Sequence, residues 1–125
     1  MASEFFRKRI QSFHYAWEGI CCLWREEKNT RIHMFFTAAV IVAGILLKVK
    51  AMEWCILVLT ISAVWFAEAI NSALERCVDL VTAEKNPLAK AAKDLAAGAV
   101  LILAIGSVVI GLVIFLPKIV NLFVY

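Results

Sequence analysis

Charged residues are scarce in this sequence. Lys, Arg, Asp and Glu together make up 18% of the 125 residues, whereas hydrophobic residues make up 63%. Soluble globular domains are about a quarter charged, and their cores do not hold apolar runs of the length found here. The composition therefore excludes an ordinary soluble domain and favours a single integral membrane domain spanning residues 1–125.

Several familiar site motifs are also missing. The sequence has no GxxxxGK(S/T) phosphate loop, no HRD or DFG, and no GxGxxG. Its four cysteines form no CxxC, and without an HExxH motif nothing indicates zinc. Basic residues do not cluster with aromatic ones, so no nucleic-acid partner is expected. A nucleotide would have to be held by carboxylate-bound metal and by scattered basic residues on helices.

Apolar runs predict two of three transmembrane helices directly. Leu95–Leu116 contains no charged residue and would reach roughly 33 Å as a helix, enough to cross a bilayer. We expect Pro117 and Lys118 to end this span. Met34–Leu47 is shorter, and the residues just before it extend it toward a full crossing.

A third helix is predicted from a run that ends at an acid. Trp54–Ala67 is apolar but reaches only about 21 Å before Glu68, less than the hydrocarbon thickness. No Gly or Pro occurs between Trp54 and Pro87. We therefore expect one long helix that carries Glu68 and the polar residues after it to the membrane surface.

The N-terminal segment is amphipathic and precedes all three runs. Aromatic and aliphatic residues recur at three- and four-residue spacings, which is typical of a helix lying in the membrane interface: Phe6, Ile10, Phe13, Trp17, Ile20 and Trp24. The sequence thus predicts an all-α membrane protein with a surface helix (4–28) and three spans (32–49, 53–80 and 88–117). The second and third spans are expected to extend into the cytoplasm.

The distribution of basic residues predicts orientation. Of the 13 Lys and Arg residues, only Lys48, Lys50 and Lys118 fall on the side opposite to the N-terminus. Positive residues favour the cytoplasmic side of a membrane. We therefore expect a multi-pass protein of the cell inner or plasma membrane, with the N-terminus and the loop after the second span in the cytoplasm.

Acidic and amide residues gather at the end of the second span. On an ideal helix Glu75 and Asp79 fall within about 20° of Glu68, with Asn71 and Ser72 beside them. Such oxygens suit Mg²⁺, and an acid at membrane depth is a functional candidate. Alternatively, Glu75 and Asp79 form a solvated face in the cytoplasm.

Two further groups of residues can be interpreted either as functional or as structural. Lys90, Lys93 and Asp94 precede the third span, where a lysine can bind phosphate or simply anchor the helix at the membrane. His33 precedes the first span and can act as a base, a ligand or an interfacial hydrogen-bonding residue.

Two of these segments resemble the signature of the prokaryotic diacylglycerol kinase family. The first runs from Glu68 to Asp79 and fits ExxN(S/T)xxExxxD, and the second contains Lys93 and Asp94 in AKDxxxxAV. The likeness covers nearly the whole chain. Within the family, the segment Asn86–Lys93 is most similar to the undecaprenol kinase branch of Gram-positive bacteria. So is His33, a position at which the diacylglycerol branch tends to have an acid.

The resemblance implies a homotrimeric helical bundle that binds ATP and Mg²⁺, with each active site shared between neighbouring subunits. It implies Glu68 as general base and Glu27 and Glu75 as metal ligands. The residues it implies for ATP and its metal are Asn71, Glu75, Asp79, Lys93, Asp94, Tyr15 and either Arg9 or Lys8.

The sequence therefore predicts a lipid kinase that moves the γ-phosphoryl of MgATP to a lipid alcohol. Undecaprenol is the first choice of substrate and diacylglycerol the second. The competing hypothesis is a non-catalytic membrane oligomer or an ion-conducting protein, since Glu68 and Asn71 also suit a cation path.

Overall fold

The structure, a computed structural model, describes residues 1–26 and 28–125, and these residues are helical almost throughout. The helices are α1 (Ala2–Glu26), α2 (Lys28–Leu46), α3 (Ala51–Val81) and α4 (Pro87–Val124), and no strand occurs among the described residues. The chain divides into two compact parts, Met1–Ile32 and His33–Tyr125. The prediction of an all-α architecture is confirmed.

The first part is dominated by α1. Its aromatic and aliphatic stripe stays exposed: Phe6, Ile10, Phe13, Trp17, Ile20 and Trp24. Local contacts on this helix are i to i+4 pairs such as Lys8 with Glu4 (3.9 Å) and His14 with Glu18 (3.0 Å). The Thr30 hydroxyl donates to the Leu23 carbonyl at 2.8 Å. An apolar stripe left uncovered suits a helix that lies against lipid.

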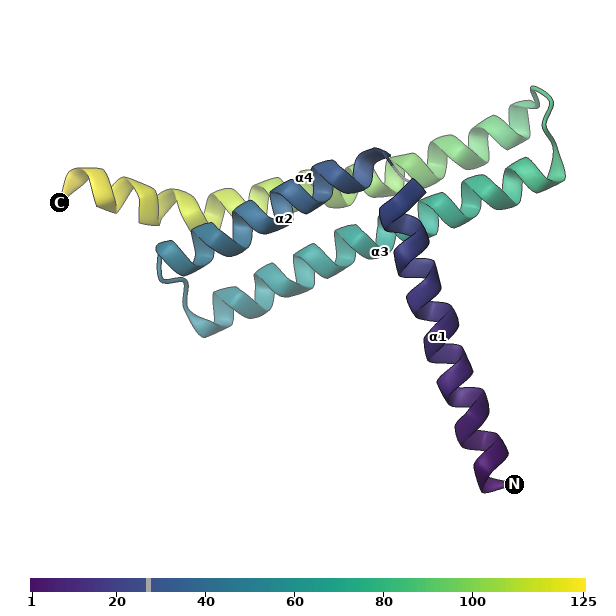
Figure 1. Ribbon diagram of the computed structural model, residues 1–125. Coiled ribbons are helices and arrows are strands. Elements are labelled where there is room, and N and C mark those ends of the chain that lie inside the picture. Colours follow the sequence, from purple (N-terminus) through teal and green to yellow (C-terminus); the bar gives the residue numbers. More distant parts are fainter. Residues whose placement is uncertain (27) are drawn as a thin grey trace. The chain divides into compact units, whose positions relative to one another are not determined.

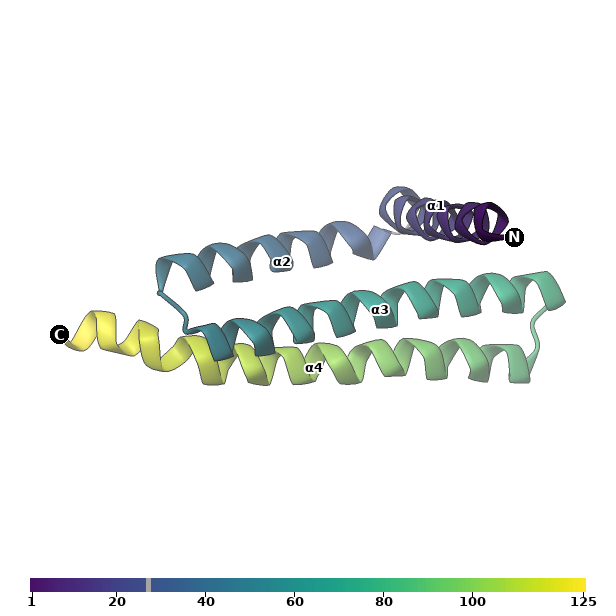
Figure 2. The same cartoon turned by 90° about the horizontal axis from the view of Figure 1, so that it is seen from below.

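The second part contains three helices that run side by side and alternate in direction (Figures 1 and 2). The three helices do not form one layer, since α2 overlaps α4 in Figure 1 but is separate from it in Figure 2, and α2 accompanies only the first half of α3. The prediction of one continuous helix through Glu68 is confirmed, since α3 has 31 residues without a break. At 1.5 Å per residue it is about 46 Å long, more than the roughly 30 Å hydrocarbon core of a bilayer.

Short, well-capped turns cause this alternation. After α2, Lys48 adopts a positive φ of 51°, and Val49 N–H donates to the Gly44 carbonyl at 3.0 Å, a Schellman-type ending. The Lys50 N–H is then capped by the Glu53 carboxylate at 2.9 Å, which begins α3. At the start of α4 the Asn86 side chain accepts from two backbone N–H groups.

The end of the bundle that holds the α2–α3 turn contains an apolar cluster. Leu57 of α3 and Ile114 of α4 are buried there with Val49, and Trp54 packs against this cluster. Gly44 allows the Trp54 ring to lie close to the backbone of α2, because a Cβ at position 44 would lie 2.5 Å from Cη2 of Trp54. This packing joins all three helices at one end.

Helix α4 extends further than the sequence predicted. It continues through Pro117 to Val124, so the expectation that Pro117 ends the helix is wrong. Proline removes a single N–H donor, and the residues after it include apolar ones that favour continuation. Beside it, Lys118 pairs with Glu53 at 3.1 Å and ties this segment to the start of α3.

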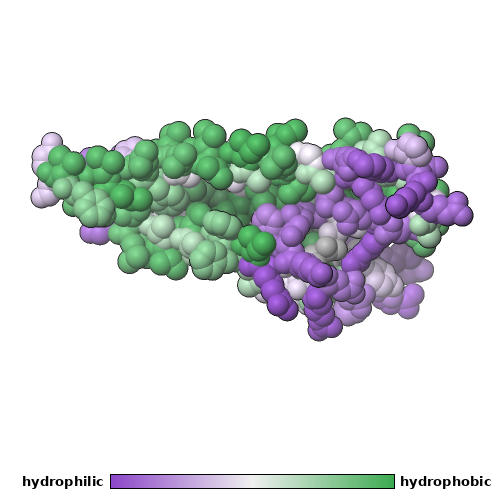
Figure 3. Space-filling model, turned by 90° about the horizontal axis from the view of Figure 1, so that it is seen from above, coloured by the Kyte–Doolittle hydropathy of each residue, from purple (hydrophilic) through white to green (hydrophobic). Residues whose placement is uncertain are grey.

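Most large apolar side chains of the second part are exposed, as expected where lipid replaces water. Three helices are long and apolar enough to cross a membrane: Lys28–Leu46, Ala51–Val81 and Pro87–Val124. Figure 3 shows a largely hydrophobic surface over the end that holds the α2–α3 turn. In such proteins packing and polar contacts, more than exclusion of water, hold the helices together.

Candidate active site

The candidate site occupies the polar half of the second part. The second half of α3 carries Glu68, Asn71, Glu75 and Asp79, and α3 ends at Val81 because Thr82 leaves the helical conformation. The short loop to Asn86 brings the first turns of α4 beside the last turns of α3 (Figure 1). Acids from α3 and bases from α4 therefore meet at one end of the bundle.

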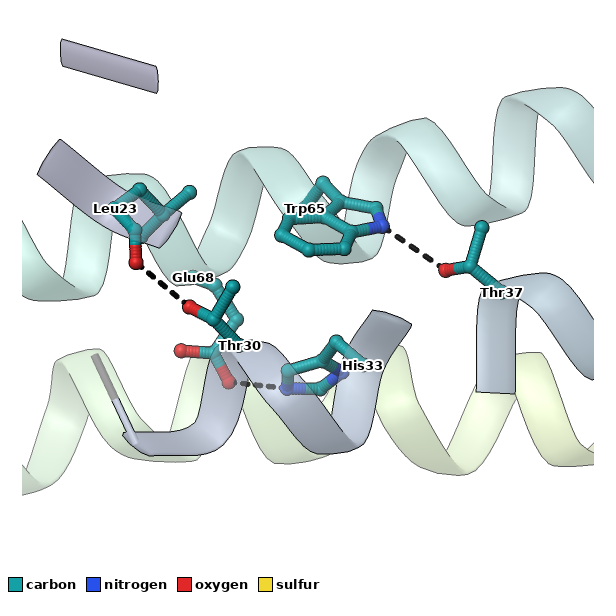
Figure 4. A network of polar contacts seen from close by, with 6 residues as sticks. All are labelled: Leu23, Thr30, His33, Thr37, Trp65 and Glu68. Atoms are coloured by element: carbon teal, nitrogen blue, oxygen red, sulfur yellow. Dashed lines mark hydrogen bonds and ion pairs between the residues drawn. The ribbon is translucent and has the colours of Figure 1, made fainter. Parts of the chain in front are cut away.

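Glu68 is buried at the start of this region. Its Oε1 lies 2.5 Å from Nε2 of His33 on α2, and the two side chains are 9% and 20% exposed. Figure 4 shows the His33 ring and the Glu68 carboxylate facing each other. A carboxylate removed from solvent needs such a partner, because an unpaired charge at this depth is costly.

A second polar contact joins the same helices one turn away. The Trp65 indole N–H donates to the Thr37 hydroxyl at 3.0 Å, and the Trp65 ring lies against the His33 ring, with centroids 6.2 Å apart. Thr37 follows His33 by one helical turn, as Glu68 follows Trp65. The two contacts therefore fix both the spacing and the rotation of α2 relative to α3 at the level of Glu68.

The next turn of α3 contains polar atoms without partners. Asn71 Oδ1 and Ser72 Oγ are buried and form no hydrogen bond with any described residue. Buried polar atoms are nearly always paired in folded proteins, so exceptions need a reason. An oxygen held ready for a ligand or a metal ion supplies such a reason here.

Beyond them, α3 and α4 are joined by ion pairs. The Lys93 ammonium donates to Asp79 Oδ1 at 2.6 Å, and Lys90 donates to Asp94 Oδ2 at 2.5 Å along α4. The Asp79 hydrogen bond raises the pKa of Lys93, which precedes the uncharged segment 95–116, and the negative charge of Glu75 adds to this effect. Lys93 is therefore a positively charged group beside two acids at neutral pH.

Glu75 is half-buried between these groups, but no set of three His, Cys, Asp or Glu residues among the described ones gathers closely enough to hold a metal ion. Mg²⁺ does not need one, since it binds one or two carboxylates together with substrate phosphates. Glu75 and the unpartnered Asn71 oxygen, one turn apart, fit that requirement. The other expected metal ligand, Glu27, lies outside the described residues.

The remaining site residues expected from the sequence lie on α1. Arg9 is exposed and its guanidinium stacks over the Phe5 ring at 5.0 Å, while Tyr15 is exposed beside His14. Their roles remain predictions. The structure thus joins Glu68 to His33 and Asp79 to Lys93, but these two pairs share no partner among the described residues.

Sequence reasoning treated His33 alone and did not single out Trp65 or Thr37. A histidine beside an apolar run can have many roles, and the partner of His33 lies 35 positions further along the chain. The sequence near His33 therefore does not identify that partner. The available signal was one polar pair on each of two neighbouring helices. His33 and Thr37 are four residues apart on one helix, and Trp65 and Glu68 are three residues apart on the next. Such spacings place each pair on one helix face.

Three membrane-length helices with a buried acid, orphaned oxygens and a lysine at the polar end define a polytopic membrane protein with a polar site at one end of its bundle. Residues 14–115 match the prokaryotic diacylglycerol kinase family, and the chain belongs to that family. The resemblance drawn from the two sequence motifs is thereby confirmed, and with it the class of enzyme, a lipid kinase.

Individual relatives carry two names. The chain is 45% identical to the undecaprenol kinase of Bacillus subtilis over 109 residues, 87% of this chain and 89% of the relative. It is 44% identical to the diacylglycerol kinase of Synechocystis over 116 residues, 92% of this chain and 66% of the relative. It is 31% identical to the diacylglycerol kinase of Escherichia coli K12 over 104 residues, 83% and 85% of the two chains.

Proposed function

We propose that this protein transfers the γ-phosphoryl group of MgATP to the hydroxyl of undecaprenol, giving undecaprenyl phosphate and ADP. The observation that carries the proposal is the buried Glu68 carboxylate, hydrogen-bonded to His33 at the membrane end of the polar site. The similarity to the Bacillus subtilis undecaprenol kinase supports the choice of lipid.

In this proposal Glu68 is the general base. The lipid hydroxyl gives its proton to the Glu68 carboxylate as its oxygen forms a bond to the γ-phosphorus, and the bond from that phosphorus to the ADP oxygen breaks. The proton later leaves Glu68 for solvent. Phosphoryl transfer needs little beyond alignment and neutralisation of charge, and a buried, oriented carboxylate supplies the alignment on the lipid side.

Mg²⁺, when bound, neutralises the charge on the phosphates of ATP. Glu75 and Asn71 would hold it, since the two residues lie one helical turn apart and the side-chain oxygen of Asn71 has no partner among the described residues. Glu27 is proposed as a further ligand. Lys93, which is paired with Asp79, would bind the phosphates, and Asp94, Tyr15 and Arg9 complete the proposed nucleotide site.

The membrane arrangement is part of the proposal. The polar end of the bundle faces the cytoplasm, where ATP is present, and α1 lies on the membrane surface with its exposed aromatic stripe in the lipid. A homotrimer is proposed as the active form. Three helices alone enclose little of a site, and a Cβ on Gly98 would meet no atom of the described residues within 4 Å, which leaves room for a neighbouring helix.

A competition assay tests the choice of lipid. Undecaprenol and diacylglycerol are offered together in one mixed micelle with γ-labelled ATP, and the labelled lipids are separated. We expect label mainly in undecaprenyl phosphate and none with Glu68→Gln. A clear preference for diacylglycerol, the substrate named for the Synechocystis and Escherichia coli relatives, would make the chain a diacylglycerol kinase instead.

A thermal-shift assay separates the kinase from an ion-conducting oligomer. A kinase binds nucleotide in its folded state, so ATP with Mg²⁺ should raise the melting temperature. A channel that uses Glu68 and Asn71 for cation passage should respond to neither. No stabilisation by saturating nucleotide, with no transfer of label, would leave the channel hypothesis in place of the proposed function.

A further inference from the structure

We infer that His33 is a positioning residue for Glu68: its Nε2–H holds Oε1 of the carboxylate, so that Oε2 is the oxygen that takes the proton of the lipid alcohol. The inference rests on the proposed function, because it assigns a partner to the proposed base. It adds a residue from α2 to the side chains of α3 and α4 at the polar end of the bundle.

The contact has the properties of a specific interaction. The Nε2 to Oε1 distance is 2.5 Å, and both side chains are largely shielded from solvent. A carboxylate oxygen only accepts, so Nε2 must carry a hydrogen, either as the Nε2–H tautomer or in the imidazolium. The bond engages one oxygen of Glu68, and no other hydrogen bond to this carboxylate occurs among the described residues.

The surroundings keep the imidazole in place. The Trp65 ring lies against it, and Trp65 is itself fixed by its hydrogen bond to Thr37 (Figure 4). No pair of Cα atoms from α2 and α3 comes within 8 Å among the described residues, in contrast to α3 and α4. The His33–Glu68 contact thus reaches across a wider gap between helices, and a smaller residue at position 33 would leave the carboxylate free to rotate.

The chain contains its own control pair. His14 and Glu18 also lie within contact distance, at 3.0 Å, but both are on α1 and their side chains are 68% and 60% exposed. Such a solvated pair orients little. A substitution that breaks this pair separates the general loss of a histidine from the loss of the buried contact.

The first experiment compares His33→Leu, His33→Gln and His14→Gln as full-length proteins in micelles containing undecaprenol. For His33→Leu we expect kcat to fall about 10- to 100-fold with KM for ATP unchanged, as for loss of one hydrogen bond to a charged group. The glutamine amide N–H can replace Nε2–H, so His33→Gln should keep at least about a third of kcat. His14→Gln should match the wild type.

If His33 had only a structural role, both substitutions at position 33 would lower the amount of folded protein. Such a role would not lower kcat at constant KM, and glutamine would not restore activity. Full activity of His33→Leu, or equal losses in a folded His33→Gln, would overturn the inference. Absence of transfer by the wild type overturns the proposed function, whereas wild-type transfer that His33→Leu leaves intact overturns only the role of His33.

A second measurement does not depend on activity or on a folded leucine variant. The sequence has two histidines, so ¹⁵N-histidine labelling of His14→Gln leaves the His33 ring as the single imidazole signal. We expect a protonated Nε2 whose proton resonance moves when Glu68→Gln is added. An Nδ1–H tautomer, or a resonance that ignores Glu68→Gln, would contradict the inference.

Discussion

The two ends of the α2–α3–α4 bundle are held together by different means. At the α2–α3 turn, Leu57, Ile114 and Trp54 pack in an apolar cluster, and one ion pair, between Lys118 and Glu53, lies beside it. At the other end the contacts are ionic or polar, as between Asp79 and Lys93, and buried oxygens on Asn71 and Ser72 lack partners among the described residues.

This difference indicates that the two ends of α3 and α4 have different roles. Packing at the apolar end gives α3 and α4 a fixed register, and that register positions the side chains of the polar end. A polar end that contains unpartnered oxygens is less stable than it need be, which is typical of sites that bind ligands. Substitutions at the two ends should therefore affect different measurements.

Of the substitutions that compare the two ends, Glu75→Gln is expected to have the largest effect. This change removes a proposed metal ligand but little packing, because Glu75 is half-exposed. We expect transfer of label from ATP to lipid to fall by at least about 100-fold with an unchanged melting temperature. Glu84→Gln, in the exposed loop before α4, is the matched control, and near-normal transfer by a folded Glu75→Gln protein would reject the metal assignment.

At the apolar end, Gly44→Ala should have the opposite signature. The added Cβ would lie 2.5 Å from the Trp54 ring, and overpacking of this kind typically costs about 1–3 kcal/mol. Unfolding by sodium dodecyl sulfate in mixed micelles should show this loss, with normal kcat for the folded fraction.

Gly111→Ala serves as the control for Gly44→Ala, because a Cβ on Gly111 would meet no atom of the described part of the chain within 4 Å. It should be neutral or slightly stabilising, since alanine is the better helix former. If both alanine variants unfold alike, the close contact of Gly44 with Trp54 does not control the stability of this end.

A smaller effect is expected for Asp79→Asn at the polar end. Lys93 would keep its charge but lose the partner that orients it, so KM for ATP should rise by about 10-fold with little change in kcat. Asp79 is 62% exposed, and the melting temperature should stay within about 2 °C of the wild type, as for other solvated ion pairs. An unaltered KM for ATP in steady-state kinetics would show that Asp79 does not contribute to nucleotide binding.

The sequence predicted the helices well because each has a local cause. Long apolar runs, the absence of Gly and Pro in α3, and the Asn86–Pro87 start of α4 are all properties of neighbouring residues. The helix after Pro117 was missed because a proline is a strong stop signal in water, whereas a terminal apolar segment that pairs through Lys118 with Glu53 continues past it.

The candidate site was predicted in part. The spacing of the acids on α3 identified Glu68, Asn71 and Glu75 from one helix alone, because helical periodicity is local. Which neighbouring helix each acid meets depends on the rotation of packed helices, which no local pattern encodes. The contact of Glu68 with His33, and the Trp65–Thr37 bond beside it, therefore emerged only from the fold.

The smallest expected effect concerns pH and the stability of the polar end. The pKa of Lys93 is raised by its bond to Asp79, so the stabilisation is fully present below the ordinary lysine pKa of about 10.4 and is lost as pH rises through the raised value. The difference in melting temperature between wild type and Asp79→Asn should thus be constant from about pH 7 to 9 and shrink above about pH 10. Thermal melts in micelles across this range measure it, with Glu84→Gln as a control that shows no such trend. A difference that already declines between pH 7 and 9 would mean that some group other than Lys93 responds to the loss of Asp79, and that the raised pKa of Lys93 is not the source of the difference in stability.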